Sequence, residues 1–121
     1  MKVIIAGSRR INGDDTPDII NKAYADAGFN ATVIIHGCSG GVDAWAHVWA
    51  RDNDLDVCRI PAEWSRYGKR AGPMRNHSMA LVADALIAIW DGESRGTLDM
   101  ITTARRLGLK VHVHDPKEVT R

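Results

Sequence analysis

The sequence has little of what builds a disulfide framework, a metal-stapled domain or a membrane segment. It has two cysteines, Cys38 and Cys58, and no further Cys or His at zinc-finger spacing, which argues against a disulfide scaffold and a structural zinc site. Sixteen basic and fifteen acidic residues leave a formal net charge of +1, so a surface built throughout for nucleic acid is not expected. The longest apolar run, residues 85–90, is far too short to span a bilayer.

What is present is the composition of an ordinary globular protein. The 121 residues are 45% hydrophobic and 26% charged, enough for one buried core, and we expect a single domain over residues 1–121. The opening MKVIIAGSRR enters a strand pattern directly and does not resemble a secretory signal. Together with the unpaired cysteines, this predicts a cytoplasmic protein.

Short apolar runs alternate with amphipathic stretches along the chain. The apolar runs predict strands at Val3–Ala6, Val33–Ile35, residues 55–60, residues 85–90 and residues 110–114. Helical spacing and end signals predict helices from Thr16 to about Ala27, from Val42, from Pro73 to Ala83, and from an N-cap at about Thr97 to Gly108. Strands that alternate with helices in this way form a parallel sheet.

The polarity of the strands predicts their order in that sheet. The first, second and fourth strands are apolar throughout, as central parallel strands are. The third and fifth contain polar residues, which suits the two edges. We therefore predict an α/β fold with a Rossmann-like, doubly wound sheet of five parallel strands in the order 3-2-1-4-5, and helices on both faces.

In such a sheet, ligands bind at the carboxyl ends of the strands. The loops that leave the first four strands read GSRR, HGCSGGVD, PAEWSRYGKRAGPMRN and WDGESRGT. The third of these loops and the adjoining strand end are basic: Arg59, Arg66, Lys69, Arg70 and Arg75 oppose a single acid, Glu63. This local charge favours a phosphorylated ligand.

The sequence indicates different roles for three of the tryptophans. Trp64, in the basic loop with Tyr67, could stack on a base or anchor the loop in the core, and the sequence leaves both readings open. Trp45 and Trp49 recur at helical spacing and are expected to be core residues.

The glycine-rich turn after the second strand is predicted to hold a phosphate. Gly40 and Gly41 allow backbone N–H groups to approach an anion at a helix start, where the helix dipole favours negative charge. Gly96 and Thr97 offer a second such helix terminus. The same turn matches the G-x-S-x-G nucleophile elbow around Ser39, but 121 residues leave little room for that larger fold, and we expect Ser39 to hydrogen-bond the anion instead.

No metal or cofactor is expected. His112 and His114, followed by Asp115, could form a metal pair on one strand, but no third ligand is in sight, and an exposed edge strand is the preferred interpretation. The sequence contains neither G-x-G-x-x-G nor G-x-x-x-x-G-K-[ST], so neither an ordinary NAD site nor a P-loop is supported.

The four loop motifs, taken in order, resemble the YspA-like branch of the SLOG superfamily. The carrying stretches are VIIAGSRR, HGCSGGVDAWAHVWA, PAEWSRYGKRAGPMRNHSM and ADALIAIWDGESRGTLDMI, which together cover nearly the whole chain. The resemblance implies a Rossmann-like domain that binds a nucleotide-derived ligand, with the DNA-processing protein DprA and the lonely-guy phosphoribohydrolases as relatives. Some members of the superfamily sense or process signalling nucleotides, including ADP-ribose derivatives.

The sequence departs from the hydrolase pattern of the lonely-guy relatives, P-G-G-x-G-T-x-x-E. Gly92, Gly96 and Thr97 match this pattern, but Met100 stands where the catalytic Glu belongs, and Asn76 follows Arg75 where a Lys belongs. A thioether cannot stabilise a ribosyl cation or position water, so the chain is expected to bind its ligand without cleaving it. If it is an enzyme, the carboxylate comes from one of three other positions: Asp43, Asp91 or Asp99.

The leading prediction is therefore a protein that binds, and sequesters, a nucleotide-derived signal such as an ADP-ribose derivative or a cyclic nucleotide. The alternatives are a nucleotide-cleaving N-glycosidase and, less favoured, a DprA-like binder of single-stranded DNA. No membrane partner is expected, and the apolar face of MALVA leaves a homo-oligomer open. The expected ligand-binding residues are Gly7, Ser8, Arg9, Gly37, Ser39, Gly40, Gly41, Asp43, Trp64, Lys69, Arg75, Asn76, Asp91, Gly92, Ser94, Gly96 and Thr97.

Overall fold

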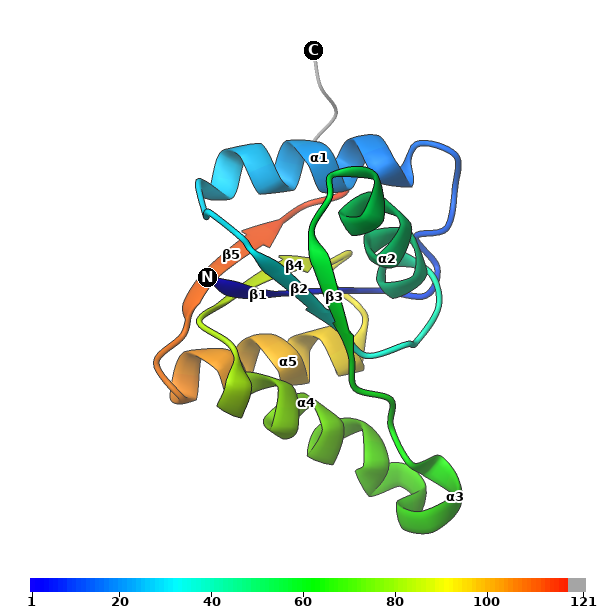
Figure 1. The fold of residues 1–121 in the computed structure, drawn as a ribbon. Helices are drawn as coiled ribbons and strands as arrows, with labels where there is room; N and C mark the ends of the chain where they lie inside the picture. The colour runs from blue at the N-terminus through cyan, green and yellow to red at the C-terminus, as the bar shows by residue number, and fades with distance from the viewer. Residues whose placement is uncertain (118–121) are drawn as a thin grey trace.

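Five strands form one sheet between two layers of helices in the computed structural model, which describes residues 1–117 (Figure 1). The strands are β1 (Lys2–Gly7), β2 (Val33–His36), β3 (Asp56–Arg59), β4 (Ala85–Ile89) and β5 (Lys110–His114). The helices are α1 (Thr16–Ala27), α2 (Val42–Asp52), α3 (Trp64–Tyr67), α4 (Ala71–Val82) and α5 (Arg95–Arg106), with a 3-10 turn, η1, at Gly68–Arg70.

All strands are parallel and lie in the order β3-β2-β1-β4-β5, which confirms the predicted fold. β1 pairs with β2 from Lys2 opposite Val33, and with β4 from Val3 opposite Ala85. The chain therefore starts at the centre of the sheet and builds outward on each side. The direction of winding reverses between β1 and β4, which is where an open α/β sheet binds its ligand.

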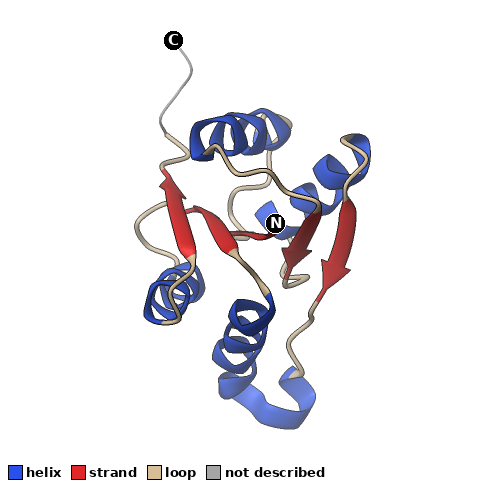
Figure 2. Ribbon diagram, turned by 60° about the vertical axis from the view of Figure 1, so that its left-hand side comes forward, coloured by secondary structure: helices blue, strands red, loops and turns tan. Residues whose placement is uncertain are grey.

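The side chains of β1 alternate between two cores, one on each face of the sheet. Val3 and Ile5 pack with α1 and α2 around Trp49, while Ile4 and Ala6 pack with α4 and α5 around Met79 and Met100. Figure 2 shows the helices on both sides of the strands. Burial on both faces explains why the central strands are uninterrupted apolar runs. Trp49 is a buried core residue as expected, whereas Trp45 is only partly buried and packs against this core.

Two helices begin earlier than the sequence signals indicate. α4 starts at Ala71, so Pro73 lies inside its first turn; this is tolerated because the N–H groups of that turn need no helical partner. α5 starts at Arg95, and its N-cap is Ser94, whose side chain accepts a hydrogen bond from the Thr97 N–H. The predicted N-cap, Thr97, is instead a buried residue of the first turn.

The long loop after β3 also contains structure that the sequence analysis did not predict. Residues 64–70 form α3 and η1, which project beyond the amino-terminal end of α4 (Figure 1). β3 and β5 are edge strands as predicted, but His114 on β5 is only 2% exposed, so the expectation of an exposed strand is wrong for this side chain. Among residues 1–117, no helix is long and apolar enough to cross a membrane, and no three metal-ligating side chains gather.

Candidate functional site

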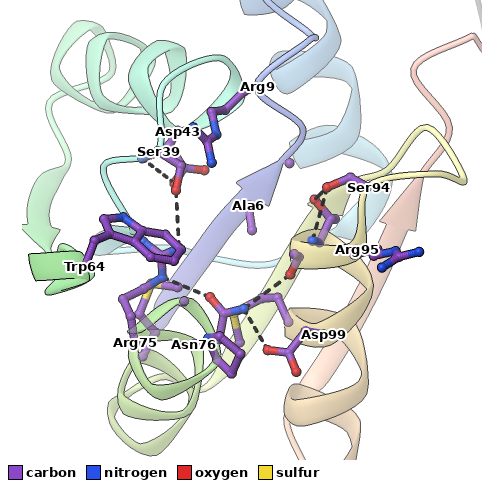
Figure 3. Close-up of a pocket in the computed structure, with 17 residues that line it drawn as sticks. Ala6, Arg9, Ser39, Asp43, Trp64, Arg75, Asn76, Ser94, Arg95 and Asp99 are labelled. Carbon is purple, nitrogen blue, oxygen red and sulfur yellow. Dashed lines mark hydrogen bonds between the residues drawn. The ribbon is translucent and has the colours of Figure 1, made fainter. Parts of the chain in front are cut away.

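A pocket of about 320 Å³ opens at the carboxyl end of β1, at the switch point of the sheet. Its volume is at the lower end of the range for small-molecule sites, roughly 300 to 1,000 Å³. Arg9, Ser39 and Asp43 lie on one side of it, Ser94 on the other, and Ala6 between them (Figure 3). Its lining is Ala6, Gly7, Arg9, Ser39, Asp43, Trp64, Gly72, Pro73, Arg75, Asn76, Met79, Ser94, Arg95, Gly96, Thr97, Asp99 and Met100.

Arg75, on the first turns of α4, links the helix to the loop after β2. Its Nη1 donates to the Gly37 carbonyl, its Nη2 donates to Ser39 Oγ at 3.2 Å, and its Nε donates to Asn76 Oδ1 at 3.0 Å. A Cβ on Gly37 would collide with the guanidinium, so glycine is required there for this approach. Burial lowers the pKa of Arg75, although Asp43 opposes this effect, and the group remains a cation.

Asn76 joins Arg75 to the far wall of the pocket. It is 5% exposed, and its Nδ2 donates to Asp99 Oδ2 at 2.9 Å and to the Gly96 carbonyl at 3.2 Å. The amide therefore has partners on both its oxygen and its nitrogen, as a buried polar group needs. A chain of hydrogen bonds runs from the loop after β2 through Arg75 and Asn76 to α5, and it fixes the width of the pocket.

Asp43 organises the loop after β2 from beneath. Its Oδ2 accepts from the N–H groups of Gly37, at 3.2 Å, and Ser39, at 3.1 Å. Burial raises the pKa of Asp43, while hydrogen bonds from Ser39 and Gly37 and the charge of Arg75 act in the opposite direction. The side chain therefore has a structural role, because it shapes the loop.

The helix termini differ in what they offer an anion. In the turn before α2, the N–H groups of Gly37, Cys38, Ser39, Val42 and Asp43 have protein acceptors, whereas those of Gly40 and Gly41 have none within residues 1–117. In α5, the Thr97 N–H is capped by Ser94, and within residues 1–117 no acceptor faces the N–H groups of the helix's first two residues, 95 and 96. Free donors at a helix start form an anion site. The free N–H groups of α5 belong to residues that line the pocket, whereas Gly40 and Gly41 lie outside its lining.

Two cations share the other side of the pocket. Arg9 and Arg75 are close enough that the charge of Arg9 lowers the pKa of Arg75. Arg9 forms no ion pair with the described residues, whereas its neighbour Arg10 lies 3.4 Å from Glu93 at the surface. The Arg95 side chain extends away from the pocket (Figure 3). Asp43 lies on the same side and its charge acts on Arg75, so the two guanidinium groups outnumber the acid there, and together they can hold an anion.

Trp64 borders the pocket from the projecting segment. Its side chain is 52% exposed, which excludes the alternative that it anchors the loop in the core. The edge of the indole ring lies over Gly72, where a Cβ would come within 3.0 Å of it. An exposed indole beside a pocket is a surface on which a planar ring can stack.

The structure brings together many of the predicted site residues. Of the expected residues, the pocket is lined by Gly7, Arg9, Ser39, Asp43, Trp64, Arg75, Asn76, Ser94, Gly96 and Thr97, and Asp99 lines it too. Outside its lining are Ser8, Gly37, Gly40, Gly41, Lys69, Asp91 and Gly92. Asp91 instead accepts from the N–H groups of Glu93 and Ser94, which hold its pKa below the usual value.

Several residues that line the pocket are not among the site residues expected from the sequence. They are Ala6, Gly72, Pro73, Met79 and Arg95. Ala6 and Met79 belong to the core beneath the pocket, and a core pattern does not reveal which of its members border a cavity. Met100, noted for standing in place of a glutamate, lines the same floor and is 1% exposed.

A doubly wound parallel sheet with a cationic pocket at its switch point defines a Rossmann-like protein with a site suited to a small anionic ligand. Residues 1–67, more than half of the chain, match the model of the YspA, cpYpsA-related SLOG family. This chain belongs to that family, which is nucleotide-related. The match ends before α4, so Arg75, Asn76 and the start of α5 lie outside it.

Two individual proteins are similar to the chain. The Gene 61 protein of Mycobacterium phage D29 is 34% identical over 85 residues, which cover 65% of this chain and 68% of that protein. The crystal structure of DNA processing protein A (DprA) from Streptococcus pneumoniae superposes with a TM-score of 0.73 and 21% identity over 93% of this chain. The chain spans about half (49%) of the DprA chain, and at 21% identity this likeness shows the fold alone.

Proposed function

We propose that this protein binds a nucleotide-derived small molecule in the pocket at the end of β1. The observation that carries the proposal is the pair of guanidinium groups, Arg9 and Arg75, which face a cavity whose opposite wall has the unpaired N–H groups at the start of α5. Both features favour phosphate oxygens. The family is itself nucleotide-related.

The remaining lining supports a ligand with a base as well as phosphate. Trp64 offers an exposed ring for stacking, and Ala6, Met79 and Met100 give the floor an apolar surface. Within residues 1–117, no protein donor contacts the second carboxylate oxygen of Asp99, so this oxygen can accept from a ribose hydroxyl. An ADP-ribose derivative or a cyclic nucleotide has all of these parts, and sequestering such a signal is the role we propose.

The test is the binding of ADP-ribose, measured by calorimetry, in two variants that remove the same charge. Arg9→Met is expected to weaken binding about tenfold, because it removes one charge-assisted contact at an exposed site. Arg10→Met is the control: Arg10 is adjacent in the sequence, does not line the pocket, and pairs with Glu93 at the surface. Equal losses in both variants, or none in either, would contradict the proposed position of the anion.

Asp99 favours a second candidate function, cleavage of an N-glycosidic bond. Of the three acids considered from the sequence, Asp43 is engaged by the loop after β2, Asp91 does not line the pocket, and Asp99 lines it with Asn76 orienting one of its oxygens. In this reaction water adds to the anomeric carbon and gives up a proton, the bond to the base nitrogen breaks, and the base leaves with a proton. A carboxylate can position that water.

Asp99→Asn separates the two functions. If the protein is an enzyme, this variant loses the release of free base from ADP-ribose or AMP, followed by chromatography, whereas its affinity falls by no more than the loss of one ribose contact. If the protein only binds, wild type releases no base, and the nucleotide is recovered intact from the denatured protein. Release of base by wild type and Asp99→Asn at equal rates would exclude Asp99 as the required carboxylate.

A further inference from the structure

His36, the last residue of β2, lies under the loop that holds Arg75 and is 3% exposed. Its Nδ1 accepts a hydrogen bond from the Cys38 N–H at 3.1 Å. Its Nε2 lies 3.0 Å from Nδ1 of His47, a residue of α2. One imidazole thus joins the loop to the helix that follows it.

These two contacts determine where the proton of His36 resides. Because Nδ1 accepts the Cys38 N–H, it carries no hydrogen, and the single proton of the neutral ring is on Nε2. Nε2 then donates to His47 Nδ1, so His47 carries its own proton on Nε2. A further proton on His36 can enter only at Nδ1, and there it would displace the Cys38 N–H.

The backbone that His36 holds is strained. Cys38 has a φ of 61°, in the left-handed region that residues with a side chain rarely adopt. Three hydrogen bonds keep residues 37–39 in this shape: the Cys38 N–H donates to the imidazole of His36, and the N–H groups of Gly37 and Ser39 donate to Asp43. Such strain persists only where the surroundings impose it.

The strained segment is the one that positions Arg75. The Gly37 carbonyl and Ser39 Oγ are two of the three acceptors that hold its guanidinium, and both flank the Cys38 N–H that His36 binds. We infer that His36 is a positioning residue of the anion site, which acts as a neutral imidazole to hold residues 37–39 in the conformation that aims Arg75. The functional part of this inference rests on the proposed binding of an anion by Arg75.

The surroundings of His36 keep it neutral. Burial is the largest effect, and the charges facing it come from His47 on α2, Arg59 on β3 and Arg75 on α4; together they lower the pKa of His36 from 6.5 to about 4. The ring therefore stays uncharged throughout the physiological range, and its contact with Cys38 does not come and go with pH.

Two variants separate the two nitrogens of His36. The side-chain oxygen of His36→Asn occupies the place of Nδ1, can accept the Cys38 N–H and cannot be protonated. The side-chain amide of His36→Gln reaches the place of Nε2, can contact His47 and leaves the Cys38 N–H without its acceptor. If His36 only fills space, both variants should have similar effects. If it positions residues 37–39, His36→Gln should have a larger effect than His36→Asn.

The first measurement needs no ligand. Long-range ¹H–¹⁵N spectra of the labelled wild-type protein are expected to show the His36 proton on Nε2 from pH 7.5 down to pH 5. In His36→Gln, hydrogen exchange at the Cys38 N–H and the Arg75 Nε–H is expected to be about fivefold or more faster than in wild type, because one hydrogen bond is lost. In His36→Asn, both exchange rates should stay within about twofold of wild type. A proton on Nδ1, or equal exchange in the two variants, would overturn the inference.

The second measurement is the affinity for ADP-ribose at pH 7.5. His36→Gln is expected to bind about fivefold or more weakly than His36→Asn, in line with the loss of one hydrogen bond. If the exchange pattern is as expected but wild type does not bind ADP-ribose, the positioning of Arg75 by His36 stands and the proposed ligand is wrong. If wild type binds and the two variants bind equally, the inference is overturned.

Discussion

Arg75→Met is expected to reduce the affinity for ADP-ribose more than a hundredfold. The change removes a cation that faces the pocket together with the donors that hold Gly37 and Ser39 in place. A hydrogen bond to a charged group contributes about 1.5 to 3 kcal/mol, and each 1.4 kcal/mol is a factor of ten in affinity. We expect a loss of free energy at the upper end of this range, because the variant removes both a charge from the pocket and the hydrogen bonds that shape its wall.

Arg75→Lys and Arg70→Met are the controls, each measured in the same titration. Lysine keeps the charge but cannot donate to three acceptors from one planar group, so an intermediate loss, about tenfold, is expected. Arg70→Met changes the net charge as much as Arg75→Met does, but Arg70 is exposed on η1 and does not line the pocket, and its affinity should stay within about twofold of wild type. A loss in Arg70→Met as large as in Arg75→Met would mean that overall charge, and not this pocket, binds the ligand.

The fold was predictable from sequence because its signals are local. The burial of both faces of the sheet makes Val3–Ala6 of β1 and all of β4 apolar, and polar residues such as Asp56 and Arg59 mark an edge strand. Given strands that alternate with helices, few parallel arrangements satisfy both patterns. The order of the strands then predicts the edge of the sheet at which the pocket opens.

The interior of the site was less predictable because its contacts join residues far apart in the chain. Nothing near Asn76 in the sequence indicates that its amide bonds Asp99, 23 residues further on, or that Arg75 reaches Gly37, 38 residues before it. Asp43 could be recognised as an acid at a helix start, but its bonds to backbone N–H groups depend on how the preceding loop curls. These are tertiary contacts, which leave no periodic pattern of residue types in the sequence.

The basic loop shows the same limit within one segment. Trp64 and Lys69 are five residues apart, yet the first borders the pocket and the second does not. The two short helical turns at residues 64–70 decide this: the ring of Trp64, at the start of α3, lies over Gly72, whereas Lys69, on η1, is exposed and outside the lining. Fewer charged side chains of this loop face the pocket than its sequence suggests.

Gly40 and Gly41 were assigned the same role from the sequence, and the structure separates them. Both have positive φ, 78° and 54°. At Gly40 a Cβ would meet open space, whereas at Gly41 it would lie 2.5 Å from Arg9 Cα and 2.6 Å from the Ser8 carbonyl oxygen. Gly41 is thus the point where the loop after β2 crosses the backbone of the loop after β1.

Gly41→Ala is therefore expected to destabilise the protein by about 3 to 5 kcal/mol. About 1 to 3 kcal/mol comes from a backbone conformation that essentially only glycine adopts, since its ψ is −124°. A similar amount comes from forcing a methyl group against backbone atoms that cannot rotate away. The separation of the two loops would also move Arg9 away from Arg75, so a folded fraction should bind ADP-ribose poorly.

Gly40→Ala is the matched control and is expected to cost only about 1 kcal/mol. A residue with a Cβ in the left-handed region lowers the free energy of unfolding by about 1 to 2 kcal/mol. Part of this loss is offset because alanine reduces the conformational freedom of the unfolded chain. Urea unfolding of both variants and wild type measures the difference. If the two variants were equally stable, the crossing of the two loops at Gly41 would not constrain the fold, and the cost at each position would be that of the backbone conformation alone.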